Sequence, residues 1–169
     1  MSVRQLIVLA AVGAALAACE TVPMNSYAPV GRPTSAAFNP GDFAWSTQPG
    51  RGTIDGRITY SRDGQPFDCT GSVALTPDTP YTRARFRTLY GATDRAAIPE
   101  AVVRARTVPD PNADYRSFVR STTCQNGRFE FSGLPDGDWF IITPVSAGGD
   151  RIVLMRQVGT RGGRVSVTL

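Results

Sequence analysis

The sequence contains no histidine and no lysine, and only three of its 169 residues are cysteine. Without histidine, the chain cannot build a Ser-His-Asp or Cys-His catalytic arrangement from its own residues. Zinc sites usually draw on histidine or on several cysteines, so a zinc ion held by this chain is not expected either. Carboxylates, tyrosine and arginine remain as possible catalytic groups, but no setting that would activate a nucleophile is visible. We therefore expect a protein that is not an enzyme and that has no metal site and no cofactor.

Because lysine is absent, all 18 positive side chains are arginine, and the net charge is +4. The arginines are spread along the chain and no nucleic-acid-binding motif accompanies them, so nucleic acid is not an expected partner. Glycine occurs 17 times and proline 13 times in a chain of single-domain length. This composition is typical of short strands that are joined by many turns.

The N-terminal segment begins with a positive charge at Arg4, and residues 6–19 then carry no charge. That apolar run is 14 residues long. It is shorter than the roughly 20 residues that a helix needs to cross a bilayer. A charged start, a short apolar core and small residues at the end predict a secretory signal peptide, here a signal helix within residues 1–18.

The apolar run ends in residues 16–19, LAAC, which resemble the lipobox of bacterial lipoproteins. In that family, lipid is attached to the cysteine sulfur and the peptide is cut just before the cysteine. The resemblance implies lipidation of Cys19 and attachment to membrane lipid. Glu20 stands where an aspartate tends to retain such proteins at the inner membrane, so the outer membrane is implied, with the domain facing the periplasm. The alternative is plain secretion, because residues 15–17, ALA, also fit a small-x-small cleavage site.

Residues 19–50 contain five prolines and no apolar periodicity, so they are predicted to form an extended tether that follows the lipidated cysteine. Phe43 and Trp45 are exceptions in this segment, because aromatic side chains seldom stay in water. We expect them to pack on the edge of the folded domain. A contact site for a partner is the alternative.

Residues 51–169 show several short runs in which apolar and polar residues alternate, separated by turns rich in glycine and proline. Asn126-Gly127 is a strong hairpin signal, because both residues tolerate positive φ. The pattern predicts an all-β domain, an antiparallel β-sandwich of seven or eight short strands. Residues 91–116 depart from it, and we expect an insertion outside the sandwich core, with a short helical start at Pro99.

A longer motif supports this domain. Residues 127–142 read GRFEFSGLPDGDWFII, which resembles the G-x-F-x-F-x-x-L-P-x-G-x-Y signature of carboxypeptidase regulatory-like domains. These are grouped with transthyretin-like, or prealbumin-like, sandwiches. Trp139 replaces the usual tyrosine, and the insertion at 91–116 is long. The resemblance implies a seven-stranded Greek-key sandwich and an accessory or binding role without catalysis.

Cys69 and Cys124 are the two thiols that remain once Cys19 carries lipid. Exported proteins fold in an oxidising compartment, so we predict a disulfide between them. The alternative is two free, buried cysteines that act as small apolar residues.

Three sets of side chains are candidates for ligand binding. Residues 81–90 are predicted to form a strand in which three arginines share a face and bind an anion, unless that face is simply solvated: Arg83, Arg85 and Arg87. Three aspartates near turns could hold calcium, although turn chemistry explains them better: Asp136, Asp138 and Asp150. Six aromatics could form a sugar-stacking platform, although packing explains them better: Trp45, Tyr60, Tyr81, Tyr90, Tyr115 and Trp139.

Two functions are consistent with these features. The first is a membrane-anchored envelope lipoprotein whose β-sandwich is a non-catalytic binding or scaffolding module for an envelope protein or the cell wall. The second is a carbohydrate-binding module displayed on the outer membrane. Exposed, coplanar aromatics would favour the second, and a continuous arginine-rich or apolar patch would favour the first.

Overall fold

The computed structural model describes residues 36–69, 71–108 and 114–169, which belong to one compact unit. The predicted signal helix, Cys19 and the first part of the predicted tether lie outside these residues. None of the helices in the described part of the chain is long and apolar enough to cross a membrane.

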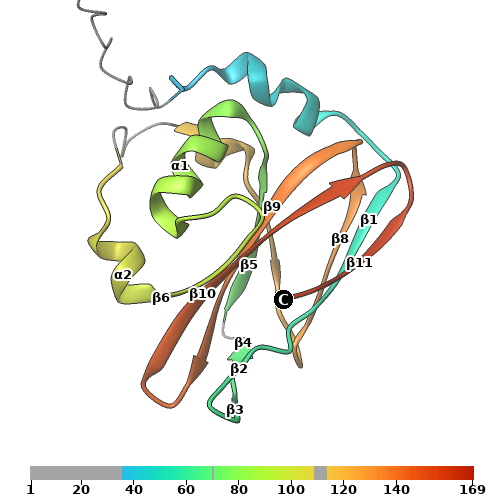
Figure 1. Ribbon diagram of the computed structural model, residues 1–169. Helices are drawn as coiled ribbons and strands as arrows, with labels where there is room; N and C mark the ends of the chain where they lie inside the picture. The colour runs from blue at the N-terminus through green and yellow to red at the C-terminus, as the bar shows by residue number, and fades with distance from the viewer. Residues whose placement is uncertain (1–35, 70, 109–113) are drawn as a thin grey trace, which may run out of the picture. The chain divides into compact units, whose positions relative to one another are not determined.

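Two packed β-sheets form the body of the described domain (Figure 1). The larger sheet has the strand order β6-β10-β9-β5-β7, and β4 also pairs with β9. Its strands are β4 (Asp68–Cys69), β5 (Ser72–Pro77), β6 (Arg95–Pro99), β7 (Arg120–Thr123), β9 (Gly137–Ala147) and β10 (Asp150–Thr160). The smaller sheet has the order β11-β1-β8, from β1 (Gly52–Arg57), β8 (Arg128–Leu134) and β11 (Arg164–Thr168). A short hairpin joins β2 (Ser61–Arg62) to β3 (Gln65–Pro66).

The β-rich sandwich confirms the predicted fold class in outline, but its strands differ from the seven antiparallel strands that the sequence predicted. The described residues contain eleven strand segments, and β1 runs parallel to β11, with Ile54 opposite Val165. After β10 the chain leaves the larger sheet and joins the smaller one as β11, which lies beside β1 and runs in the same direction. Greek-key connectivity stays a prediction.

The main core lies between the two sheets. Apolar side chains at alternate positions point inward, as the period-two pattern predicted: Ile54 on β1 and Val73 and Leu75 on β5 are fully buried. Trp139 at the start of β9 is also fully buried, and its indole N–H donates to the Thr160 hydroxyl at 3.1 Å. Because a buried indole N–H needs an acceptor, this bond fixes the tryptophan side chain in the core.

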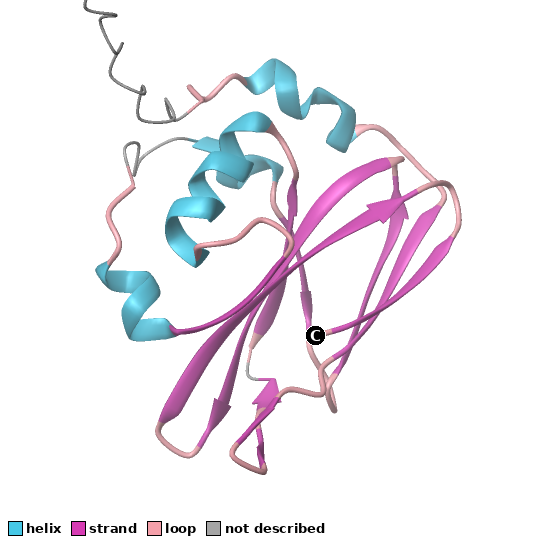
Figure 2. Cartoon of the chain, viewed as in Figure 1, coloured by secondary structure: helices cyan, strands magenta, loops and turns pink. Residues whose placement is uncertain are grey.

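Residues 81–90 form a helix, so the prediction of a strand there is wrong. The helix α1 (Pro80–Tyr90) begins at a capping box between Thr79 and Thr82 and ends at Gly91, whose φ is +76°. Phe86 and Tyr90, which lie one helical turn apart, pack with Phe140 on the outer face of the larger sheet. The domain therefore has a third layer, formed by α1 on the side of the larger sheet that faces away from β1 (Figure 1), and Figure 2 shows the helices in cyan on the sheets in magenta.

The predicted insertion is part of the larger sheet. Its strand β6 pairs antiparallel with β10 along five residues, so the expectation that this segment lies outside the sandwich is wrong. The predicted helical start is confirmed, since α2 (Glu100–Ala105) follows Pro99 directly. A 3₁₀ helix, η2 (Asp114–Phe118), completes the insertion.

The predicted tether is too long at its C-terminal end. A 3₁₀ helix, η1 (Pro40–Thr47), packs on the domain, with Phe43 fully buried and stacked on Phe118 at 4.7 Å between ring centroids. Trp45 packs edge-on against Trp139. The expectation that Phe43 and Trp45 pack on the domain is confirmed, and their burial extends the folded region to before residue 51.

Candidate functional site

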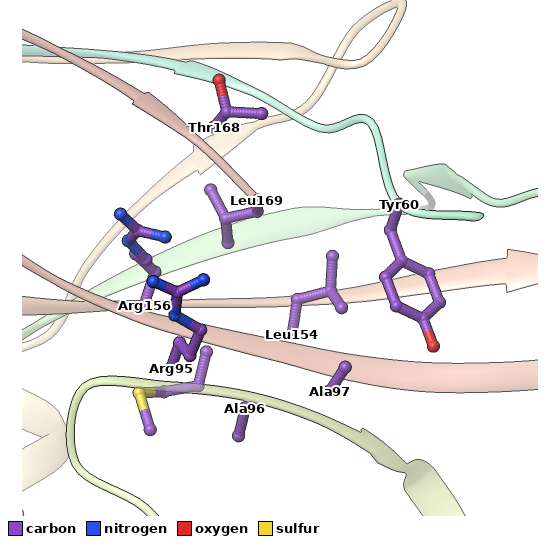
Figure 3. Close-up of a pocket in the computed structure, with 9 residues that line it drawn as sticks. Tyr60, Arg95, Ala96, Ala97, Leu154, Arg156, Thr168 and Leu169 are labelled. Carbon is purple, nitrogen blue, oxygen red and sulfur yellow. The ribbon is translucent and has the colours of Figure 1, made fainter. Parts of the chain in front are cut away.

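An open groove of about 440 Å³ lies where the two sheets part, between β6 and β10 of the larger sheet and the end of β11 in the smaller one. Figure 3 shows the side chains that line it. Tyr60 stands at one end, and the guanidinium groups of Arg95 and Arg156 lie side by side at the other. Leu154 and Leu169 lie between the two ends. The volume is within the range of small-molecule sites.

Strand register places the groove residues. On β10, Leu154 and Arg156 are two residues apart, so they project from the same face of the sheet. Ala97 is the partner of Leu154 across the ladder, and Arg95 is the partner of Arg156. Leu154 belongs to the core between the sheets, so this face looks toward the smaller sheet. Its neighbour Met155 belongs instead to the cluster under α1.

Small side chains keep the groove open at its β6 wall. Ala97 has only a methyl group at the position beside Leu154, and β6 is an edge strand, so no further strand covers it. At the far end, the ring of Tyr60 is held by edge-to-face packing on Phe67, with centroids 5.2 Å apart. The Phe67 N–H also donates to the Tyr60 carbonyl at 3.0 Å. The groove therefore combines an anchored aromatic ring with an apolar middle.

The arginine end of the groove carries two positive charges that form no ion pair among the described residues, since no carboxylate there lies within ion-pair distance of Arg95 or Arg156. Asp94 is the nearest acid in sequence. Its pKa is lowered mainly by hydrogen bonds from backbone N–H groups, and more weakly by attraction to both arginines. Its carboxylate thus satisfies backbone donors, and the two guanidinium groups stay available to a ligand.

The three arginines predicted to share a face do not do so, because residues 81–90 are helical. On a helix, Arg83 and Arg87 lie one turn apart and Arg85 points the opposite way. Arg83 pairs with Asp78, and Arg85 is buried, donates to the Tyr81 hydroxyl at 3.2 Å and lies over the Tyr115 ring. The predicted anion-binding patch therefore has no geometric basis.

The aspartates considered for calcium are not brought together. Asp138 and Asp150 lie at opposite ends of the β9–β10 ladder. Asp138 pairs with Arg161, and Asp150 pairs with Arg62. Across the described residues, no group of three or more His, Cys, Asp and Glu side chains is placed to hold a metal ion.

The six aromatics do not form an exposed platform either. Tyr81, Tyr90 and Trp139 are buried, at 2%, 7% and 0% exposure. Burial raises the pKa of Tyr90 to about 12, as expected for a phenol removed from water. Of the six, Tyr60 is the one that lines the groove, so stacking on a sugar would involve a single ring here.

Cys69 and Cys124 form a disulfide, as predicted, with Cα atoms 6.1 Å apart. The bond joins β4 to the chain just after β7, and Cys124 is 8% exposed. Both cysteines lie at the inter-sheet core. The disulfide therefore has a structural role and lies away from the residues that line the groove.

A second hollow, beside the smaller sheet and β7, is polar, and the two acids that line it lie next to an arginine. Arg164 pairs with Asp55 and lies 3.5 Å from Glu130. The hydrogen bond from Arg164 is the main cause that lowers the pKa of Asp55. Because these charges neutralise one another, this hollow is a weaker candidate than the groove.

Sequence reasoning missed the groove. Arg95, Ala97 and Arg156 were not singled out, because residues 91–116 were assigned to an insertion outside the core. The strand β6, Arg95–Pro99, reads RAAIP, which is short and lacks alternation of polar and apolar residues, so the sequence carries little signal for it. Its pairing with β10 depends on tertiary structure.

Comparisons with known proteins found similarity to a solved structure. No protein-family model matches the chain, and no curated protein does. Among solved structures, the chain is similar to the crystal structure of a candidate carbohydrate binding protein from Pseudomonas aeruginosa. The two are 26% identical in sequence, the match covers 78% of this chain and 97% of that chain, and the TM-score is 0.51. The match thus spans nearly the whole of the other protein.

Proposed function

We propose that this chain is a lipid-anchored envelope protein whose β-sandwich is a non-catalytic binding module, and that the ligand of the module is a carbohydrate. The observation that carries the proposal is the groove between the sheets. It has a tyrosine ring at one end, apolar side chains in the middle and two arginines at the other end. A sugar has both apolar C–H faces and polar hydroxyl groups, so these surfaces can contact it. The similarity to a candidate carbohydrate binding protein favours this ligand class over others.

Docking of a protein partner through an apolar patch has less support. Among the described residues, Val102 on α2 is the large apolar side chain that stands exposed, at 41%. Single exposed apolar residues are normal on soluble proteins, and a docking surface needs a contiguous patch. We assign no reaction to the groove, since the side chains that line it include no carboxylate that could act as acid, base or nucleophile.

The carbohydrate proposal is tested by affinity electrophoresis of the full-length protein, purified in detergent, through gels that contain one polysaccharide each. We expect retardation by at least one polysaccharide, and loss of that retardation in Ala97→Trp, because the indole would fill the groove beside Leu154. Ala44→Trp is the matched control, since Ala44 is exposed on η1 and does not line the groove. Equal retardation of both variants and of wild type would place the binding elsewhere, and no retardation in a broad panel would reject the ligand class.

The anchor rests on the LAAC motif at residues 16–19 and on Glu20 after it. Several acyl chains, each of whose buried methylenes contributes about 0.8 kcal/mol, would hold the protein at the outer membrane, with the domain in the periplasm. Growth on labelled palmitate tests this. The wild-type chain should be labelled and should sediment with membranes, and Cys19→Ser should lose both properties.

A further inference from the structure

Arg95 and Arg156 are directly opposed across the β6–β10 ladder. Side chains in such a position are roughly 5 Å apart at their Cβ atoms, and like charges placed there repel each other. The adjacent pair on the same face, Leu154 with Ala97, carries no acid, so on this face of the sheet nothing offsets the repulsion. Asp94 attracts both arginines only weakly, since backbone N–H groups are the main cause that lowers its pKa.

The smaller sheet provides an internal comparison. Arg57 and Arg128 are also directly opposed, across the β1–β8 ladder. There the adjacent pair on the same face is Asp55 with Glu130, and Arg128 contributes to the lowered pKa of Asp55. The chain thus places two acids beside one arginine pair on its own sheet face. Beside the other pair that face is apolar, and Asp94, which attracts both of these arginines, forms no ion pair with either among the described residues. An anion from outside the domain would complete the second pair.

The groove geometry restricts what that anion can be. The two guanidinium groups lie side by side at one end, facing Thr168 and Leu169, and the groove continues from them over Leu154 to Tyr60 (Figure 3). A free inorganic ion would fill only the arginine end. A ligand that uses the whole groove needs an anionic group on a body with apolar faces, and a sugar ring that bears a carboxylate has both.

The chemistry of the donors favours a carboxylate. Two planar guanidinium forks match the two oxygens of a planar carboxylate with parallel N–H···O bonds. Phosphate sites commonly use a helix N-terminus or a run of backbone N–H groups, and the lining residues of this groove come from strands and strand ends. The C–H faces of a pyranose ring would lie against the apolar middle and the ring of Tyr60.

We propose that the groove binds an acidic polysaccharide through its uronic acid residues, with Arg95 and Arg156 as the carboxylate clamp. This inference rests on the proposed carbohydrate-binding function and names its substrate class. Tyr60 then sets the position of the sugar ring along the groove, and Ala97 leaves the space that the ring needs.

The experiment compares one polymer in two chemical forms. A polyuronic acid and the same polymer after reduction of its carboxyl groups to alcohols are titrated into the full-length protein in detergent by calorimetry, at two salt concentrations. We expect the acidic form to bind and the reduced form to bind at least about tenfold more weakly. Arg95→Gln and Arg156→Gln should each weaken binding of the acidic form about tenfold, since each removes one charge-assisted pair.

The control variant is Arg57→Gln/Arg128→Gln, which removes the same charge as Arg95→Gln/Arg156→Gln from the other opposed pair. This control should bind the acidic polymer as tightly as wild type does. If it lost as much affinity as the groove variant, the effect would be due to net charge alone, and the clamp would be overturned. Equal binding of the acidic and reduced polymers would also overturn the clamp, but would leave carbohydrate binding intact. Tighter binding of a sulfated or phosphorylated polymer would reject the carboxylate, and binding of no polymer would reject both the clamp and the carbohydrate function.

Discussion

The guanidinium of Arg83 pairs with the carboxylate of Asp78, and only 2% of that aspartate side chain is exposed. Asp78 lies between the end of β5 and the start of α1, and it also accepts a hydrogen bond from the Gln157 amide on β10. Burial raises the pKa of Asp78, although attraction to Arg83 opposes the shift. The aspartate thereby links the helix layer to the larger sheet.

Removal of Arg83 should destabilise the domain. Arg83→Gln leaves a buried carboxylate without its charged partner, and we expect a loss of about 2 kcal/mol, below the cost for a fully buried pair because Arg83 is partly exposed. Arg87→Gln is the control on the same helix face, where the side chain is exposed, and should change stability by less than about 0.5 kcal/mol. Urea unfolding of both variants measures the difference. Equal stability of the two would show that the ion pair contributes nothing.

The raised pKa of Asp78 makes a prediction about pH. A carboxyl group whose pKa is higher in the folded state than its ordinary value of 3.8 binds its proton more tightly when folded. Its stabilising contribution is therefore complete below about pH 4 and is lost as the pH rises through the folded pKa. In Asp78→Asn this contribution is absent, so the stability of wild type relative to the variant should fall as the pH rises from 3.8. An increase over the same range would mean that pairing with Arg83 outweighs burial.

The strands of the sandwich could be predicted from sequence where apolar residues alternate strongly. Ile54, Leu75 and Trp139 lie in strands, and each is fully buried. The helix α1 was missed because its arginines alternate at period two. Thr79 and Gly91, which cap the helix, were the local signals that contradicted this reading.

The groove could not be predicted in the same way. Its walls come from segments far apart in sequence, since Tyr60, Arg95 and Arg156 meet only after β6 pairs with β10 and β11 closes beside them. A single sequence gives no measure of that pairing. The disulfide could be predicted because two cysteines remain once Cys19 is set aside as the expected lipidation site.

Loss of the disulfide should lower the stability of the domain. Cys69 and Cys124 are 55 residues apart in sequence, and a bond that closes a loop of this size restricts the unfolded chain. We expect Cys69→Ser/Cys124→Ser to lose about 2–4 kcal/mol. Reductant should destabilise the wild type to a similar extent and leave the double variant unchanged. Two thiols that can be alkylated in native wild-type protein would contradict the bond.

The last prediction concerns η1 and the glycine beneath it. Gly137 has a φ of +157°, and a Cβ added there would lie 2.1 Å from Cζ3 of Trp45. Gly137→Ala must therefore displace Trp45, and the cost should be about 2 kcal/mol, as for other overpacked sites. Gly149→Ala is the control, because a Cβ there meets nothing within 4 Å.

Tryptophan fluorescence measures the displacement. The chain has two tryptophans and Trp139 is fully buried, so a red shift of the emission in Gly137→Ala reports exposure of Trp45. If the emission and the stability both stay at wild-type values, η1 is not an integral part of the fold, and residues 40–47 belong with the tether after all.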